Sequence, residues 1–254
     1  MLMETVARWF LDLYETTGIN LTIVYDAYDR QRFLSGLGMT IYLAVVCILI
    51  SIAIGAVGAW AQGSPLRVVR GLVNGFVVIF RNTPPLVQIF FFYFGLGQIL
   101  PRIEDADGMR VPILTNVQWA IVSLSLFAGA FNVEIFRSGL EAVPRTTTEA
   151  AQALGYTRLG VYRHVLLPLA LRICLPALNN NLVNLLKTTT LAYAIAVPET
   201  LYVSKQIWTD SQNVPVMMIV LLIVYTLLVG ILVFIMHRWE KALAIPGYGQ
   251  GSGR

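Results

Sequence analysis

The fold class is decided by residues 38–60, which read GMTIYLAVVCILISIAIGAVGAW. This segment contains no Asp, Glu, Lys or Arg, and the charge-free run around it extends from Phe33 to Leu66. A helix needs about 20 predominantly apolar residues to cross the hydrocarbon core of a bilayer. The sequence therefore predicts a membrane span at residues 38–60.

Outward from this segment, four further stretches are long and apolar enough to span a membrane, at residues 82–100, 116–138, 173–197 and 214–236. The composition agrees, because 57% of the residues are hydrophobic and 13% are charged, whereas soluble domains carry about 25% charged residues. We expect an all-α membrane protein with about five transmembrane helices. Residues 66–80, with Arg67 and Arg70 before an apolar run, predict an amphipathic helix that leads into the second span.

The basic residues predict the orientation, because cytoplasmic loops are enriched in Lys and Arg. With five spans and the N-terminus outside, the C-terminus lies inside. The inner side then receives most of the basic residues, namely Arg67, Arg70, Arg81, Arg137, Arg145, Arg158, Arg163, Arg172, Arg238, Lys241 and Arg254. Most of the acidic residues fall on the outer side. We expect an extracytoplasmic segment at residues 1–33, a transmembrane domain at 34–241 with an inner loop at 140–172, and a Gly-rich tail at 242–254.

Two local patterns predict helix starts. Residues Arg81–Pro85 indicate a helix restart, with Asn82 or Thr83 as the cap and Pro84 in the first turn. In the inner loop, Thr146 and Glu149 have the spacing of a capping box, which predicts a helix that begins at Thr146. Gly155 should end or bend that helix, a second short helix should follow from about Thr157, and Pro168 should mark the next turn.

The inner loop carries a longer and more specific string. It contains Glu149-Ala150-Ala151, then Gly155 after three residues, then Val165-x-Leu167-Pro168 after nine more. This string resembles the "EAA" loop of binding-protein-dependent ABC importer permeases, EAA-x3-G-x9-I-x-L-P, with Val165 in place of Ile. Three more segments are similar to permeases for polar amino acids: Arg81–Gln88 to R-[GN]-T-P-x-L-V-Q, Glu134–Gly139 to E-I-x-R-[GS]-G, and the stretch from Asn180 to Leu191. Residues Ile245–Tyr248 are also similar to that family, and the likeness covers roughly residues 35–248.

The resemblance implies a type I importer permease that moves polar amino acids delivered by a periplasmic binding protein. It implies a heteromeric complex in the bacterial inner membrane, with a dimer of ABC-type ATPase subunits and a second permease that is homologous or identical. It also implies that the EAA loop forms a coupling helix against the ATPase. The coupling residues would be Glu149, Ala150, Ala151, Leu154, Gly155, Tyr156, Arg158 and Leu159.

The chain contains no G-x-x-x-x-G-K-[ST] phosphate loop, so ATP and Mg would be bound by the partner ATPase. We therefore expect a non-catalytic subunit without a cofactor of its own. No spacing typical of a metal site occurs, and Cys47 and Cys174 lie in apolar surroundings that suit packing. We expect contact with membrane lipid and none with nucleic acid.

Polar residues in or beside the predicted spans are candidates for a substrate path, because intramembrane polar groups are costly and often functional. The candidates are Thr83, Gln88, Asn132, Glu134, Asn180, Asn181, Asn184, Lys187, Thr188 and Thr189. A structural role is the alternative. Glu134 could pair with Arg137 one turn on, Lys187 could pair with Glu134 or reach an interface, and Asn or Thr could bridge helices.

Other classes of membrane protein fit the sequence less well. A secondary transporter would show an internal repeat or a chain of intramembrane acids, and neither is visible. A membrane enzyme would need clustered His, Asp, Glu or Cys. A purely structural scaffold would leave the EAA string unexplained. The sequence leaves open which amino acid is carried, whether the second permease is identical, and whether residues 1–33 contact the membrane or the binding protein.

Overall fold

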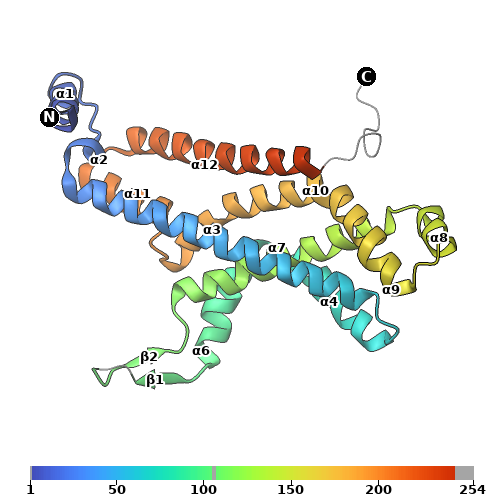
Figure 1. The fold of residues 1–254 in the computed structure, drawn as a ribbon. Coiled ribbons are helices and arrows are strands. Elements are labelled where there is room, and N and C mark those ends of the chain that lie inside the picture. The colour runs from blue at the N-terminus through green and yellow to red at the C-terminus, as the bar shows by residue number, and fades with distance from the viewer. Residues whose placement is uncertain (1, 105–106, 244–254) are drawn as a thin grey trace. The chain divides into compact units, whose positions relative to one another are not determined.

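A computed structural model describes residues 2–104 and 107–243 of the chain. Within this part the chain is helical, with one two-stranded ribbon (Figure 1). The elements are α1 (Leu2–Thr17), α2 (Thr22–Tyr25), α3 (Ala27–Gln62), α4 (Arg67–Asn82), α5 (Pro85–Phe90), η1 (Phe91–Leu96), α6 (Gly97–Ile99), β1 (Arg102–Glu104), β2 (Arg110–Pro112), α7 (Asn116–Glu141), α8 (Arg145–Ala153), α9 (Arg158–Val161), η2 (Tyr162–Leu166), α10 (Leu167–Thr188), η3 (Thr189–Ile195), α11 (Thr200–Ser211) and α12 (Val214–Leu243).

Four helical stretches of the described chain are long and apolar enough to cross a membrane: α3, α7, residues 158–195 and α12. The bent pair formed by α4 and residues 85–99 brings the number to five if it counts as one span. These stretches overlap all five predicted spans, so the helical membrane fold is confirmed with four to five candidate spans. The four long stretches are longer than predicted, because the helical backbone continues past the apolar core into polar sequence, whereas the helical residues 85–99 are fewer than the predicted span 82–100.

The chain restarts a helix after α4, as the sequence predicts, with Pro85 rather than Pro84 as its first residue. The side-chain nitrogen Nδ2 of Asn82 donates to the carbonyl of Val78 at 2.7 Å, and Thr83 Oγ1 donates to the carbonyl of Ile79 at 2.8 Å. Both side chains therefore satisfy carbonyls at the end of α4. Helix α5 begins at Pro85, where the missing N–H of proline costs no hydrogen bond.

The chain divides into two compact units. The first comprises residues 1–46, 85–124 and 186–230, and the second comprises residues 47–84, 125–185 and 231–254. In the first unit, Phe33 packs with Val203, Ile207 and Met217 in a buried cluster.

In the second unit, Ala59, Phe136 and Cys174 form a buried cluster. Helices α7 and α10 approach closely there. A Cβ atom at Gly139 would lie 2.8 Å from the carbonyl oxygen of Ala170, which explains the glycine at that position.

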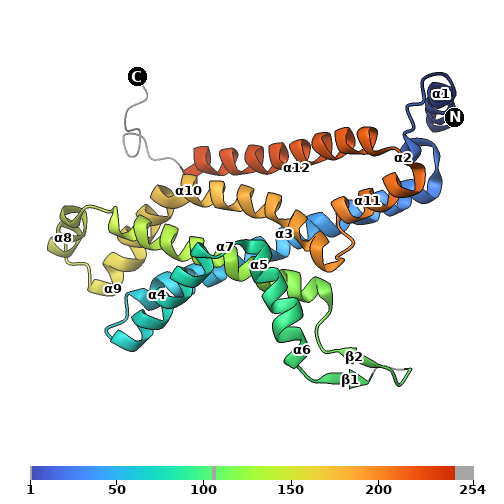
Figure 2. The same cartoon turned by 180° about the vertical axis from the view of Figure 1, so that it is seen from behind.

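An antiparallel ribbon joins α6 to α7 in the first unit (Figure 2). Its register pairs Arg102 with Pro112 and Ile103 with Val111. The sequence predicts no element between residues 100 and 116, because each strand is only three residues long. At the other end of the sequence, α12 runs to Leu243, and the rest of the expected tail at 242–254 lies outside the described residues, as do Ile245–Tyr248.

Candidate functional site

The expected coupling loop folds into two short helices, α8 and α9, in the second unit (Figure 1). Helix α8 ends in a Schellman motif. The amide of Gly155 donates to the carbonyl of Gln152 at 2.9 Å, and the amide of Tyr156 donates to the carbonyl of Ala151 at 3.2 Å. Gly155 has φ +89°, a left-handed conformation that suits glycine. The predicted helix end at Gly155 is thus confirmed, and the two hydrogen bonds satisfy carbonyls at the end of α8.

The predicted capping box at Thr146 is wrong. Helix α8 begins one residue earlier, at Arg145, and Pro144 occupies the N-cap position without a side-chain hydrogen bond. Proline fixes φ near the helical value and ends the preceding segment, so the helix starts at once after it. The predicted second helix does form, and Thr157 caps it by accepting a hydrogen bond from the amide of Gly160 at 3.2 Å.

Large apolar side chains of this segment point away from the fold. Leu154 is 81% exposed and Leu159 is 75% exposed, and Tyr156 is also exposed. Of the remaining coupling residues, Ala151 is buried, and Glu149, Ala150, Gly155 and Arg158 are exposed. We call Leu154, Tyr156 and Leu159 the apolar knob of the α8–α9 turn. It is the kind of surface that a partner protein covers.

No turn occurs at Pro168, contrary to the sequence prediction. The chain runs from α9 through the wider helical turn η2 into α10, and Pro168 lies in the first turn of α10. Proline has no N–H to donate to the preceding turn, and the wider hydrogen-bond spacing of η2 just before it accommodates the missing bond. The expected inner loop at 140–172 is therefore largely helical.

Two of the candidate path residues form a buried amide pair. Asn181 Nδ2 donates to Asn132 Oδ1 at 2.8 Å and to the carbonyl of Ala128 at 3.0 Å. Asn132 Nδ2 in turn donates to Ser51 Oγ at 3.2 Å. Asn132 is fully buried, so this network links α3, α7 and α10 of the second unit. The contacts favour the helix-bridging interpretation of these two residues.

Glu134 lies in a cluster of charges near the end of α7. Its Oε2 atom is 2.7 Å from Nη2 of Arg137 and 3.9 Å from Nη1 of Arg81. Arg137 also contacts Glu141 at 2.7 Å. The predicted pair of Glu134 with Arg137 is present, and the permease-like segments Arg81–Gln88 and Glu134–Gly139 meet here. The arginines neutralise Glu134 in place, which favours a structural role.

The other candidate path residues lie in different settings. Thr83 bonds back to α4, and Gln88 is buried in the first unit. Asn180, Asn184 and Lys187 are exposed, Thr188 is half-buried, and Thr189 is buried with its hydroxyl donating to the carbonyl of Leu186 at 2.7 Å. Lys187 occupies the last turn of α10, where a cation is favourable at the helix C-terminus.

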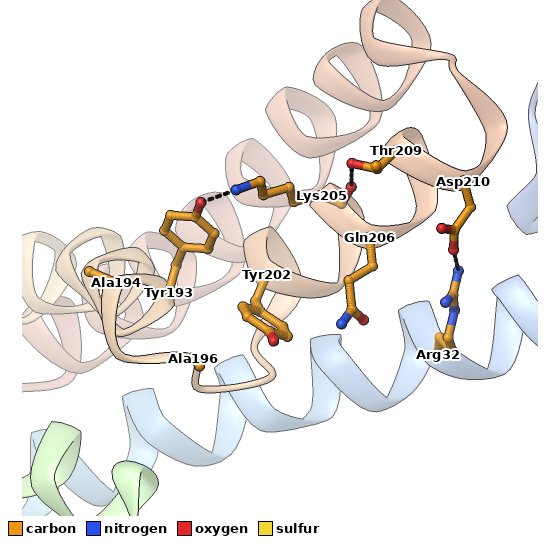
Figure 3. A pocket seen from close by; sticks show the side chains of 9 residues that line it. All are labelled: Arg32, Tyr193, Ala194, Ala196, Tyr202, Lys205, Gln206, Thr209 and Asp210. Carbon is orange, nitrogen blue, oxygen red and sulfur yellow. Dashed lines mark hydrogen bonds and ion pairs between the residues drawn. The ribbon is translucent and has the colours of Figure 1, made fainter.

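A polar cavity that sequence analysis missed lies in the first unit, with a volume of about 500 Å³. Figure 3 shows its lining from η3, α11 and the start of α3. Lys205 Nζ donates to Tyr193 Oη at 2.5 Å and lies 5.0 Å from the centre of the Tyr193 ring. Along the same wall, Arg32 pairs with Asp210 at 3.0 Å. Three-residue and four-residue spacing on α11 brings Tyr202, Lys205, Gln206 and Thr209 to one face, and only this period could have indicated them.

Among the described residues, the Lys205 ammonium has no carboxylate within ion-pair distance. The described chain also contains no group of three or more His, Cys, Asp or Glu side chains that could hold a metal. The cavity therefore presents one uncompensated cation and a phenol hydroxyl beside an Arg–Asp pair. This is a set of groups that suits a carboxylate or a zwitterion.

Glu199, which borders this cavity's wall in the sequence, was also not predicted as a site residue. It is fully buried and caps α11, with Oε2 and Oε1 accepting from the amides of Leu201 at 2.9 Å and Tyr202 at 2.8 Å. Tyr225 Oη also donates to it at 3.0 Å. Burial raises the pKa of the Glu199 carboxyl above its usual range, although these hydrogen bonds oppose the shift. The capping fixes the start of α11 and thus the wall of the cavity.

Comparison with known proteins decides the family. The model of the family described as "Binding-protein-dependent transport system inner membrane component" matches residues 51–243. The chain belongs to this family. Members are multi-pass proteins of the bacterial inner membrane, and they work in ABC transporters with a separate ATPase and a binding protein. The permease itself is accordingly a non-catalytic subunit.

Several curated relatives support this assignment. The "Probable amino-acid permease protein YxeN" of Bacillus subtilis is 30% identical over 84% of this chain and 92% of its own length. The "Nopaline transport system permease protein NocM" of Agrobacterium fabrum is 31% identical, covering 87% and 92%. The "Histidine/lysine/arginine/ornithine transport system permease protein HisM" of Salmonella typhimurium is 28% identical, covering 84% and 90%.

A solved structure shows the same fold. The crystal structure of an amino acid ABC transporter with histidines superposes with a TM-score of 0.75 at 24% sequence identity, covering 88% of this chain and 99% of that chain. The structural match supports the permease fold of the described helices.

Proposed function

We propose that this permease subunit imports polar amino acids, driven by a separate ATPase that contacts the α8–α9 segment. The observation that carries the proposal is the apolar knob of Leu154, Tyr156 and Leu159, which lies within the EAA string and is exposed on the isolated chain. The curated relatives are named as permeases for amino acids or for nopaline, which supports a polar amino acid as the substrate.

The proposed orientation puts the N-terminus outside and the C-terminus in the cytoplasm. Residues 145–161 then face the cytoplasm, where the ATPase lies, and α11 faces outward. Basic residues concentrate on the inner side in this arrangement, as expected for a bacterial membrane protein. The remaining partners are a second permease, homologous or identical to this chain, and a periplasmic binding protein. ATP and Mg would be bound by a dimer of the ATPase.

The geometry of the α8–α9 segment suits transmission of a movement. Leu154 and Leu159 lie on either side of Gly155, and the Schellman motif fixes the angle between the two helices. A partner that covers the knob would gain about 1.5–3 kcal/mol of hydrophobic free energy per leucine. Because α9 continues through η2 into α10, a displacement of the knob would act on the end of a membrane helix.

The test is co-purification of the ATPase with the permease in mild detergent. The double variant Leu154→Asp, Leu159→Asp should lose the ATPase, because two charges replace the apolar contact. The control is Gln152→Asp, which adds a charge at an exposed position of the same helix. Equal recovery of the ATPase with the wild-type permease, the double variant and the Gln152→Asp control would refute the proposed contact.

The cavity on α11 supports an outward-facing role in substrate handling. The Lys205 ammonium, which has no carboxylate partner among the described residues, and the Arg32–Asp210 pair offer partners for the carboxylate and the ammonium of an amino acid. The volume of about 500 Å³ exceeds what one amino acid needs and falls in the range of ligand pockets. We include this cavity in the proposed substrate path, together with the polar residues that the sequence indicates.

A further inference from the structure

Helix α1 carries an apolar face that the described chain leaves partly uncovered. Val6, Trp9, Phe10 and Leu13 recur at three-residue and four-residue spacing, which puts them on one side of the helix. Trp9 is 59% exposed, and Val6 and Tyr14 are also exposed. Phe10 and Leu13 are half-buried. A helix that lies in water would not leave a tryptophan and its apolar neighbours exposed along one face.

The opposite face is polar. Arg8, Asp12 and Glu15 lie there and are exposed, with Leu11 as the apolar exception. Residues 5–17 therefore form an amphipathic helix with a small negative charge on its polar side. Helices with this division of faces lie in the plane of a membrane interface, where tryptophan and tyrosine are enriched.

The position of α1 in the chain brings it to the membrane. The charge-free run begins at Phe33, directly after Arg32, so α3 enters the apolar layer near that point. Thr17 precedes Arg32 by only 15 residues, and the segment 18–26 contains a left-handed Gly18 and the short α2, which allow the chain to reverse direction. Because α1 is tethered beside a membrane span, its effective concentration at the surface is high and weak intrinsic affinity suffices.

We propose that α1 lies flat on the outer leaflet of the bilayer, with Val6, Trp9, Phe10 and Leu13 in the lipid and Arg8, Asp12 and Glu15 in water. The choice of leaflet rests on the proposed orientation, whereas the lipid contact does not. Attachment depends on apolar burial, because the polar face carries no excess of basic residues that would attract anionic headgroups.

The experiment places one environment-sensitive dye on each face. Both native cysteines are buried and would be replaced by alanine. Val6→Cys puts a nitrobenzoxadiazole dye on the apolar face, and Asp12→Cys puts it on the polar face as the matched control. The complete permease–ATPase complex is reconstituted in vesicles of phosphatidylethanolamine and phosphatidylglycerol that contain nitroxide-labelled lipid. A membrane-impermeant thiol reagent, applied to intact cells that carry the Asp12→Cys variant, reports the side of the membrane on which position 12 lies.

The proposal predicts quenching at position 6 that is several-fold stronger than at position 12, and its loss in a Trp9→Glu, Leu13→Glu background. It also predicts that the thiol of the Asp12→Cys variant reacts from outside the cell. Equal quenching at both positions would overturn the lipid contact. A change in the dye signal at position 6 that requires added binding protein and occurs without lipid quenching would overturn the lipid contact in favour of a contact with protein. Face-selective quenching with position 12 accessible only from the cytoplasm would overturn the outer-leaflet assignment and the proposed orientation.

Discussion

Asn181 Nδ2 on α10 donates a 2.8 Å hydrogen bond to Asn132 Oδ1 on α7, and both side chains are buried. This bond and the one from Asn132 to Ser51 join three helices of the second unit. An amide supplies both a donor and an acceptor, so paired amides can satisfy one another in an apolar environment.

Replacing Asn181 should therefore destabilise the helix bundle. Asn181→Leu removes two hydrogen bonds and leaves Asn132 Oδ1 without its donor, at an expected cost of about 1–2 kcal/mol. Thermal unfolding followed by size-exclusion chromatography in detergent measures the loss. The neighbouring Asn180→Leu is the control, because Asn180 is exposed. Equal melting temperatures for the two variants would contradict the bridging role.

Glu134 should act with its arginines rather than as an isolated intramembrane charge. Glu134→Gln removes the negative charge that lies 2.7 Å from Arg137 and 3.9 Å from Arg81. Because these side chains are partly exposed, we expect a loss of less than about 1 kcal/mol. A double-mutant cycle with Arg137→Gln should return a favourable coupling energy. Additive effects in that cycle would show that the pair contributes no stability.

Gly155 should be required for its backbone conformation. An added Cβ meets no atom within 4 Å, so a side chain fits, but φ +89° is strained for residues other than glycine. We expect ATP-driven uptake to fall in the order wild type, Gly155→Asn, Gly155→Val, because asparagine tolerates the left-handed region and valine does not. A third variant, Gly155→Asp, should leave membrane insertion intact and uncouple ATP hydrolysis from uptake. Full uptake by the valine variant would remove the case for a fixed turn.

Lys205 should contribute to recognition of the substrate carboxylate. In the Lys205→Gln variant, the cavity loses its uncompensated cation, so the apparent KM for uptake should rise several-fold. Lys241→Gln serves as a comparison at an exposed lysine of α12 that lies outside the proposed path. The measurement is uptake of labelled histidine, arginine, lysine, glutamine and glutamate into proteoliposomes. An unchanged KM for every transported amino acid would exclude Lys205 from the path.

Burial of Glu199 makes stability depend on pH in a defined direction. The native pKa lies above that of the unfolded chain, about 4.3, so the native state binds more protons. The stability from this carboxyl is complete below the unfolded pKa and is lost as pH rises through the native pKa. Glu199→Gln should therefore gain stability relative to wild type as pH rises from about 4 to 7. Equal pH dependence of stability for wild type and Glu199→Gln would contradict this effect of burial.

The membrane helices could be located from the sequence because uncharged apolar runs of about 20 residues are the length that a bilayer requires. The end of α8 was also predictable, since Gly155 is the residue that a Schellman motif requires. Prediction failed where several local signals compete. Thr146 has the spacing of an N-cap, but Pro144 before it starts helix α8 at Arg145. Pro168 would end a helix in most positions, but it lies in the first turn of α10, where proline is tolerated.

The site was harder to predict than the fold. Pairs such as Asn132 with Asn181 depend on how distant helices pack, and one sequence carries no signal of that contact. The cavity around Lys205 draws on η3, α11 and Arg32 of α3, which are far apart in the chain (Figure 3). The EAA string was informative because it fixes residues from Glu149 to Pro168 at set spacings, so chance agreement is small.

The most direct test of the proposed function is amino-acid uptake by the reconstituted complex. Proteoliposomes would contain this permease with its ATPase and second permease, with binding protein outside and ATP inside. We predict uptake that requires ATP, the ATPase and the binding protein together, and that stops in the Leu154→Asp, Leu159→Asp variant. Uptake by this chain alone, driven by an ion gradient without ATP, would contradict the proposed function.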